Sequence, residues 1–232
     1  KAENCLPHLS WIRFSIDAGT QENYEKIHRG GKKDFKKVIE NIKNAVEVKK
    51  TKNLKVTIGV QFLLIPQNVD EAVTLARICK EIEADNIQIK PYSQHPCSIN
   101  KFIIKYRDYA HLEQELEKIN SNNFKVLFRK KTMERVSKGI NYSECYGLPF
   151  FALIDAKGNI IPCNLYYNNP DFTYGNLYKQ SFSEIWRSEK RKQVLEKLRK
   201  KGVEQCRRGC RLDVINRYLH RLRNPHPHEN FI

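Results

Sequence analysis

The 232-residue sequence lacks a signal peptide, an apolar run long enough to cross a membrane, and any low-complexity tract. These absences argue against a secreted or membrane-bound protein, and hence against a disulfide framework of the kind found in small secreted domains. We therefore expect a soluble cytoplasmic chain. Its length and its 40% hydrophobic residues suffice for one substantial domain and a smaller one.

Acidic residues are also scarce, since 26 Asp and Glu face 42 Lys and Arg, for a net charge of +16. The imbalance is concentrated in residues 187–232, which carry 14 Lys and Arg but only 5 Asp and Glu. We interpret this segment as a solvated helix face. The alternative is a surface for a phosphorylated substrate, an acidic redox protein or nucleic acid. Aromatic residues are not interleaved through the segment, so nucleic acid is the partner least expected.

Cysteines near the C-terminal end form the most informative pattern in the chain. Cys145 and Cys163 are spaced C-x12-G-x4-C, and Cys206 and Cys210 follow as C-x3-C. Four soft ligands in this arrangement indicate a metal site, with an iron–sulfur cluster and zinc as the candidates and two disulfides as a third interpretation. Three further cysteines are interpreted as a core residue and two isolated thiols: Cys79, Cys5 and Cys97.

Turn residues predict how the first cysteine pair is brought together. Residues 150–155 and 160–163 are predicted strands around a turn that contains Gly158, so Cys145 and Cys163 become neighbours. In the second pair, Gly209 allows the short loop to turn both thiols toward one centre. Downstream of this hairpin, Ser181–Glu184 predicts a capping box that opens a helix over residues 181–200. On that helix we expect Trp186 to be a packing residue that holds the cluster domain on the preceding domain.

Strand and helix signals alternate along the first half of the chain, which predicts an α/β fold with a parallel sheet. The predicted strands are residues 11–17, 55–65 and 86–92, and the predicted helices are residues 20–27, 34–50, 68–83 and 108–119. Functional residues in parallel barrels gather at the carboxyl ends of the strands. This rule selects Ser15, Asp17, Gln61, Lys90, Tyr92 and Ser93, and Arg13 shares a strand face with Ser15 and Asp17.

Lys90 lies within the predicted strand, in the run Ile87-Gln88-Ile89-Lys90-Pro91-Tyr92. A lysine there should face a polar cavity or a carboxylate, because an unpaired buried charge is costly.

Two segments resemble radical S-adenosylmethionine enzymes. Residues 11–20, with Tyr24 and His28-Arg29-Gly30, are similar to their fourth barrel strand and the helix after it. Residues 158–163, 175–177 and 182–186, with the closing cysteine pair, resemble their SPASM or twitch auxiliary-cluster domain. The resemblance implies the second half of a partial (β/α)6 barrel over residues 1–140, followed by a small cysteine-rich domain with a β-hairpin and a helix over residues 141–232.

The resemblance also implies cofactors and site residues. The four C-terminal cysteines would hold an auxiliary [4Fe–4S] cluster that transfers electrons, since four protein ligands saturate it. S-adenosylmethionine and a second [4Fe–4S] cluster would act in the full-length protein. Ser15, with Arg13, Asp17 and Gln61, would contact S-adenosylmethionine, and Lys90 and Tyr92 would face the substrate.

The activity implied is that of a radical oxidoreductase or biosynthetic enzyme, supplied with electrons by a reductase such as flavodoxin or ferredoxin. We expect its substrate to be a small polar or anionic metabolite, sugar-like or nucleotide-like, with peptide modification as the alternative. A second class of function is a non-catalytic module that binds zinc or an iron–sulfur cluster.

The sequence departs from the family in one respect. The C-x3-C-x2-C loop that holds the radical-generating cluster is absent, and Asp213 occupies the position where a third cysteine would complete the Cys206 and Cys210 pair. Only three predicted barrel strands precede the cysteine-rich tail. We therefore expect that the first half of the barrel is missing from this chain, which alone should not cleave S-adenosylmethionine.

Overall fold

A computed structural model describes residues 2–228 and divides them into two compact units. The first unit contains the residues up to Tyr92 together with Phe102–Ser137. The second contains Ser93–Lys101 together with the described residues from Lys138 onward. Within residues 2–228, no helix has both the length and the apolar character that crossing a membrane requires.

The first unit is built on a parallel sheet of four strands in the order β1-β2-β3-β4. The strands are β1 (Trp11–Ser15), β2 (Thr57–Leu64), β3 (Asn86–Pro91) and β4 (Lys125–Phe128). The predicted parallel α/β arrangement is confirmed, but the count of three strands is wrong. β4 was missed because it has only four residues and none of them is fully buried, so its pattern is too short to stand out.

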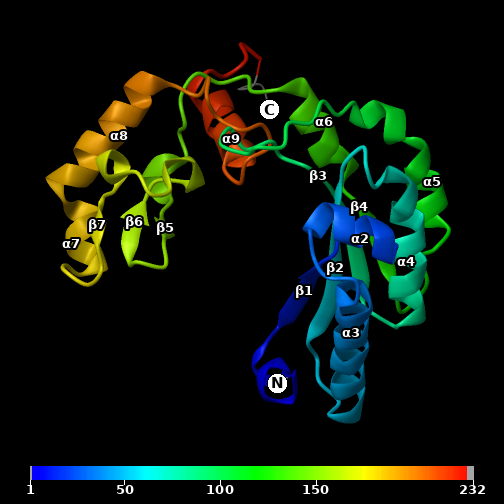
Figure 1. The fold of residues 1–232 in the computed structure, drawn as a ribbon. Helices are drawn as coiled ribbons and strands as arrows, with labels where there is room; N and C mark the ends of the chain where they lie inside the picture. The colour runs from blue at the N-terminus through cyan, green and yellow to red at the C-terminus, as the bar shows by residue number, and fades with distance from the viewer. Residues whose placement is uncertain (1, 229–232) are drawn as a thin grey trace. The chain divides into compact units, whose positions relative to one another are not determined.

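Helices pack on one face of this sheet, and α3, α4 and α5 lie beside it in Figure 1. Alternation along β2 explains the contact, because Ile58, Val60 and Phe62 are fully buried among the residues of that core. The helices and 3₁₀ turns of the unit are α1 (Ala2–Cys5), η1 (Leu6–His8), α2 (Gln21–His28), α3 (Asp34–Thr51), η2 (Val69–Glu71), α4 (Ala72–Glu81), η3 (Tyr106–Tyr109), α5 (His111–Glu117) and α6 (Lys130–Lys138).

The side chains of Asn68 and Glu71 connect the loops that follow β1 and β2. The sequence had predicted a helix that begins at Asn68. The Asn68 side chain accepts a hydrogen bond from Ile65 N (2.9 Å) and donates to the carbonyl oxygen of Asp17 (2.8 Å). Glu71 accepts the backbone N–H of Gly19 (2.8 Å). Because both side chains serve another loop, α4 begins only at Ala72.

The second unit contains a small antiparallel sheet in the order β5-β6-β7. The strands are β5 (Leu153–Ile154), β6 (Asn159–Ile161) and β7 (Gly175–Asn176). The predicted hairpin is present, but its first strand is shorter than predicted because η4 (Leu148–Phe150) occupies the start. Its turn is closed by Asp155 Oδ1, which accepts hydrogen bonds from Lys157 N (2.8 Å) and Asn159 N (2.9 Å). Gly158 takes a positive φ of 74° in this turn.

The helix predicted over residues 181–200 is two helices. Ser188 separates them, because its backbone is extended (ψ 151°) and its hydroxyl accepts a hydrogen bond from Arg191 N (3.2 Å) at the start of the second helix. The capping box of Ser181 and Glu184 is present as predicted. The helices and turns are η5 (Asn164–Tyr166), η6 (Pro170–Phe172), α7 (Phe182–Arg187), α8 (Glu189–Lys201) and α9 (Asp213–Arg223).

Candidate metal centre

Four cysteines of the second unit line a single cavity of about 300 Å³. They are the four singled out by spacing: Cys145, Cys163, Cys206 and Cys210. All seven cysteines of the chain lie within the described residues, and all are free thiols. The structure therefore contains no disulfide among these four cysteines. Instead, the four thiols converge on one cavity.

Each cysteine is held by a short, well-defined piece of backbone. Cys145 precedes η4 and Cys163 follows β6, so the hairpin returns the chain toward its starting point. Cys206 and Cys210 lie in the loop between α8 and α9, where Cys206 N donates to Val203 O (2.9 Å). α9 begins directly after this loop, and Asp213 N donates to Cys210 O (3.1 Å).

The cavity is an unfavourable place for isolated charges. Burial raises the pKa of Cys145, Cys163 and Cys210, and it raises the pKa of Cys206 to about 12. The negative charges of the neighbouring Cys145, Cys163 and Cys210 also raise the pKa of Cys206. A positively charged metal group among them would reverse both effects, because it binds the thiolate form.

The number and type of these donors limit the kinds of metal group that the cavity could hold. Among the described residues, no three His, Cys, Asp or Glu side chains are gathered tightly enough to bind one metal ion. A tetrahedral zinc site requires sulfur atoms at about 2.3 Å from a single point. The four thiols line one cavity, and both a zinc site and an iron–sulfur cluster can be held by four cysteines.

Arg207 supplies positive charge at the same place. It lines the cavity, and its Nε is buried without a hydrogen-bond partner inside the protein. A buried cationic donor with unused hydrogen-bonding capacity complements an anionic group, and a cluster held by four thiolates is anionic. The residues present therefore fit an iron–sulfur cluster.

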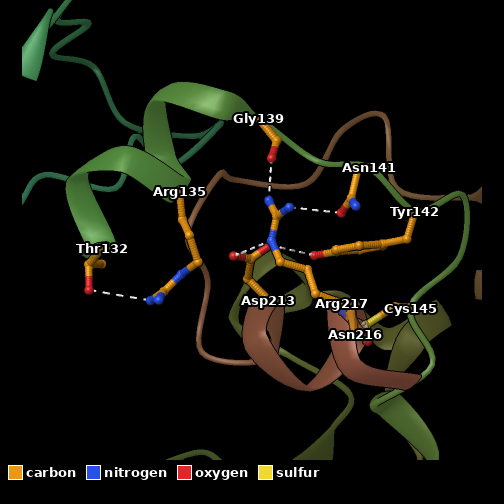
Figure 2. A network of polar contacts seen from close by, with 9 residues as sticks. All are labelled: Thr132, Arg135, Gly139, Asn141, Tyr142, Cys145, Asp213, Asn216 and Arg217. Atoms are coloured by element: carbon orange, nitrogen blue, oxygen red, sulfur yellow. Dashed lines mark hydrogen bonds and ion pairs between the residues drawn. The ribbon is translucent and has the colours of Figure 1, made fainter. Parts of the chain in front are cut away.

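A buried polar network supports Cys145 from α9 (Figure 2). Asn216 donates from Nδ2 to Cys145 Sγ (3.2 Å) and accepts Gly147 N at Oδ1 (2.8 Å). Asp213, at the position where a third cysteine was considered, is buried and accepts hydrogen bonds from Tyr142 OH (3.1 Å) and Arg217 Nε (3.1 Å). Sequence patterns did not reveal Asn216, because nothing in its neighbourhood on α9 marks a contact with a loop some 70 residues away.

Trp186 packs against the apolar cluster of the second unit. The Arg191 guanidinium lies 3.7 Å from the centroid of its ring, and Phe182 stacks on it at 5.3 Å between centroids. Arg191 also donates to the carbonyl oxygen of Pro149 (2.6 Å). Trp186 is thus a packing residue, as predicted, and these contacts lie within the second unit; its expected role in holding this unit on the preceding domain stays a prediction.

Apart from Ser93, which lies in the second unit, the remaining predicted site residues belong to the first unit, where four of them share the sheet face opposite to the buried side chains of β2. The register pairs Ser15 with Gln61, and Arg13 lies two residues before Ser15 on the same face. Lys90 Nζ donates to Gln61 Oε1 (2.9 Å), and Gln61 Nε2 donates to Ser15 Oγ (3.4 Å). The structure therefore brings together a row of polar side chains across three strands.

Asp17 and Tyr92 lie just beyond the ends of their strands, and each takes part in a hydrogen bond between a side chain and a backbone N–H. Asp17 Oδ1 accepts Leu63 N (2.8 Å), and burial raises the pKa of this carboxyl. Tyr92 N donates to the hydroxyl of Tyr106 (2.6 Å), and the ring of Tyr92 meets Phe102 edge to face. Both residues close loops at this end of the sheet.

Comparison with known families and structures agrees with this geometry. Residues 145–211, which include all four cavity cysteines, match the SPASM family, an iron-sulfur cluster-binding domain. No curated protein matches the chain.

Three solved structures illustrate the similarity of fold. Streptococcus suis SuiB bound to S-adenosylmethionine is 14% identical with a TM-score of 0.54, over 77% of this chain and 42% of SuiB. SuiB bound to the precursor peptide SuiA is 17% identical with a TM-score of 0.54, over 82% of this chain and 44% of SuiB. Native anSMEcpe with bound AdoMet and Kp18Cys peptide is 14% identical with a TM-score of 0.50, over 96% of this chain and 71% of that protein.

These identities are low and show a shared fold. The chain spans less than half the length of SuiB.

The chain is thus an α/β protein in which residues 145–211 match an iron–sulfur cluster-binding domain, SPASM. Its fold is similar to the folds of SuiB and anSMEcpe, both solved with bound S-adenosylmethionine, and the match to the SPASM domain confirms the iron–sulfur part of the resemblance found in the sequence.

Proposed function

We propose that Cys145, Cys163, Cys206 and Cys210 ligate one auxiliary [4Fe–4S] cluster in a radical S-adenosylmethionine enzyme. The observation that carries the proposal is their convergence on one cavity inside the segment that matches the SPASM domain. Four cysteines saturate the irons of a single cluster, so the cluster would carry electrons and would not bind substrate directly. One cluster with four ligands corresponds to the shorter, twitch form of the domain.

The first unit would form the second half of the enzyme's partial barrel. Its polar row of Arg13, Ser15, Gln61 and Lys90 lies on one sheet face and reaches the carboxyl ends of the strands, which is where parallel barrels bind ligands. We propose that Ser15 and Gln61, with Arg13 and Asp17, contact S-adenosylmethionine and that Lys90 and Tyr92 face the substrate. Bound there, S-adenosylmethionine and its own cluster would supply the 5′-deoxyadenosyl radical in the full-length protein.

For the substrate, the comparisons favour a peptide over the small polar metabolite expected from the sequence. SuiB has been solved with the precursor peptide SuiA bound, and anSMEcpe with AdoMet and the Kp18Cys peptide bound. The basic charge of residues 187–232 would suit an acidic peptide as well as an anionic metabolite. We therefore propose modification of a peptide or protein side chain, with the metabolite as the alternative.

Anaerobic reconstitution with iron and sulfide tests the cluster. The protein should take up iron and sulfide in equal amounts and show a broad thiolate-to-iron absorbance. Cys210→Ala should lose this absorbance, while Cys97→Ala, which removes an exposed thiol outside the cavity, should keep it. Uptake of zinc in place of iron, or an unchanged spectrum in Cys210→Ala, would refute the proposed centre.

The enzymatic part requires the full-length protein, reductant and S-adenosylmethionine. Release of 5′-deoxyadenosine is the expected result, and its absence would leave only a cluster-binding module. A library of acidic and neutral peptides compared with sugar phosphates and nucleotides then separates the two substrate classes, because only the true class should increase 5′-deoxyadenosine release.

A further inference from the structure

Asn216 is a buried polar side chain for which packing alone gives no reason. It is 1% exposed on α9, next to an apolar core, and Asp213 is the other buried polar side chain among the described residues of this unit. A leucine has a similar branched shape and would avoid the cost of removing an amide from water. The retained amide accepts the backbone N–H of Gly147 at Oδ1, and it contacts the sulfur of Cys145 in two ways: Nδ2 donates to Sγ at 3.2 Å, and Oδ1 lies 3.6 Å from Sγ, where it can accept the thiol proton.

The orientation of this amide is fixed by Gly147. A backbone N–H can pair only with the amide oxygen, so the 2.8 Å bond from Gly147 N places Oδ1 on that side. The NH2 group must then face Cys145 Sγ, at 3.2 Å. Figure 2 shows Asn216 on α9 beside Cys145 in this arrangement.

Close packing holds the contact in place. A Cβ on Gly147 would lie 3.3 Å from Asn216 Oδ1 and 3.3 Å from Ile215 Cγ2, so the absence of a side chain lets the loop of Cys145 approach α9 closely. α9 begins at Asp213, three residues after Cys210. In its first turn, Asn216 N donates a hydrogen bond to Leu212 O (2.8 Å). One helix therefore joins the positions of two cavity cysteines.

A thiolate ligand accepts hydrogen bonds and cannot donate them. When Cys145 holds iron, its sulfur has no proton to donate to Asn216 Oδ1, so the hydrogen bond from Asn216 Nδ2 to Cys145 Sγ is the contact that remains. This bond withdraws electron density from the sulfur. Hydrogen bonds to ligand sulfurs are among the factors that set the reduction potential of a cluster. Such a bond favours the reduced state, which carries one more negative charge.

We propose that Asn216 is a positioning residue that directs an N–H donor at Cys145 and thereby raises the reduction potential of the auxiliary cluster. The inference rests on the proposed function, since it assumes that Cys145 is a ligand. In this proposal a residue of α9 influences the reduction potential of the cluster, although α9 lies outside the segment that matches the SPASM domain.

The test is a potentiometric titration of the reconstituted protein, followed by electron paramagnetic resonance. Asn216→Leu removes the donor without adding charge, and its midpoint potential should be lower than that of the wild type. Asn216→Asp keeps an oxygen for Gly147 N and should load iron as the wild type does, with a lowered potential. If Asn216→Leu does not fold, Asn216→Asp carries the test alone, against a matched charge control.

That control is Asn164→Asp, which adds a carboxylate to another residue lining the same cavity. Its potential should fall less than that of Asn216→Asp. Wild-type potentials in both Asn216 variants, or equal shifts in the two Asp variants with none in Asn216→Leu, would overturn the inference. A wild-type protein that builds no cluster would instead refute the proposed function, so the two failures are distinguishable.

Discussion

Lys90 and Gln61 are joined across neighbouring parallel strands, with Lys90 Nζ 2.9 Å from Gln61 Oε1. Gln61 in turn donates to Ser15, so three strands share one polar row. The sequence predicted that Lys90 should face a polar cavity or a carboxylate, and the amide oxygen of Gln61 is a polar partner of this kind, although it is not a carboxylate. Gln61 is the middle residue, and both Ser15 and Lys90 form hydrogen bonds with its side chain.

Gln61→Leu should therefore lower the free energy of unfolding by about 1 kcal/mol, because it removes the acceptor of a partly buried ammonium group. Urea denaturation measures the change. Gln88→Leu is the matched control, since Gln88 is the register partner of Gln61 on β3. Equal losses of stability in the two variants would show that the bond to Lys90 contributes nothing of its own.

Thiol labelling should separate the cysteines by environment. Cys79 is 0% exposed on α4, and burial raises its pKa to about 12, so the reactive thiolate is almost absent at neutral pH. Cys5 and Cys97 are exposed. Iodoacetamide followed by peptide mass mapping should label those two in the native protein and label Cys79 only after denaturation. Labelling of Cys79 at the rate of Cys97 would contradict the buried position.

Gly158→Ala should destabilise the hairpin that leads to Cys163. Gly158 has a φ of 74°, and a Cβ there would lie 2.8 Å from a ring carbon of Tyr178. The left-handed backbone alone costs a residue with a side chain about 1–2 kcal/mol. Urea denaturation should show a loss at least this large, and anaerobic reconstitution should load less iron.

Lys157→Ala provides the control, because it alters the neighbouring residue of the same turn while Lys157 N can still donate to Asp155. We expect this variant to differ from the wild type by less than about 0.5 kcal/mol. A Gly158→Ala protein as stable as Lys157→Ala would mean that the turn relaxes to a different conformation.

Local patterns account for what the sequence predicted correctly. Alternation of apolar residues located β1, β2 and β3, because one face of each strand is buried under helices. The spacing of Cys145 and Cys163 around Gly158 predicted a hairpin, because the turn chemistry lies within a few residues.

Contacts between distant segments account for what was missed. Asn68 looks like a helix cap, yet its side chain serves the carbonyl of Asp17, 51 residues away. Asn216 reaches Cys145 across 71 residues. Asn and Asp side chains form local and long-range hydrogen bonds equally well, so spacing in the sequence does not reveal which partner they take.

Asp17 should give the protein a measurable pH dependence. Burial raises the pKa of its carboxyl above 3.8, against the opposing effects of the Leu63 N–H, His28 and Lys90. In the pH range just above 3.8 the folded protein therefore binds more protons at this site than the unfolded chain does. The contribution of Asp17 to the free energy of unfolding must then fall as pH rises through that range.

Asp17→Asn removes this titration while keeping an oxygen for Leu63 N. The difference in free energy of unfolding, wild type minus variant, should decrease from acid pH upward and then level off above the pKa of the folded state. High salt should not abolish the decrease, because salt screens the charges of His28 and Lys90, which lower the pKa, but not the burial that raises it. A difference that increases with pH would mean that the carboxylate is stabilised by those charges more than burial opposes it.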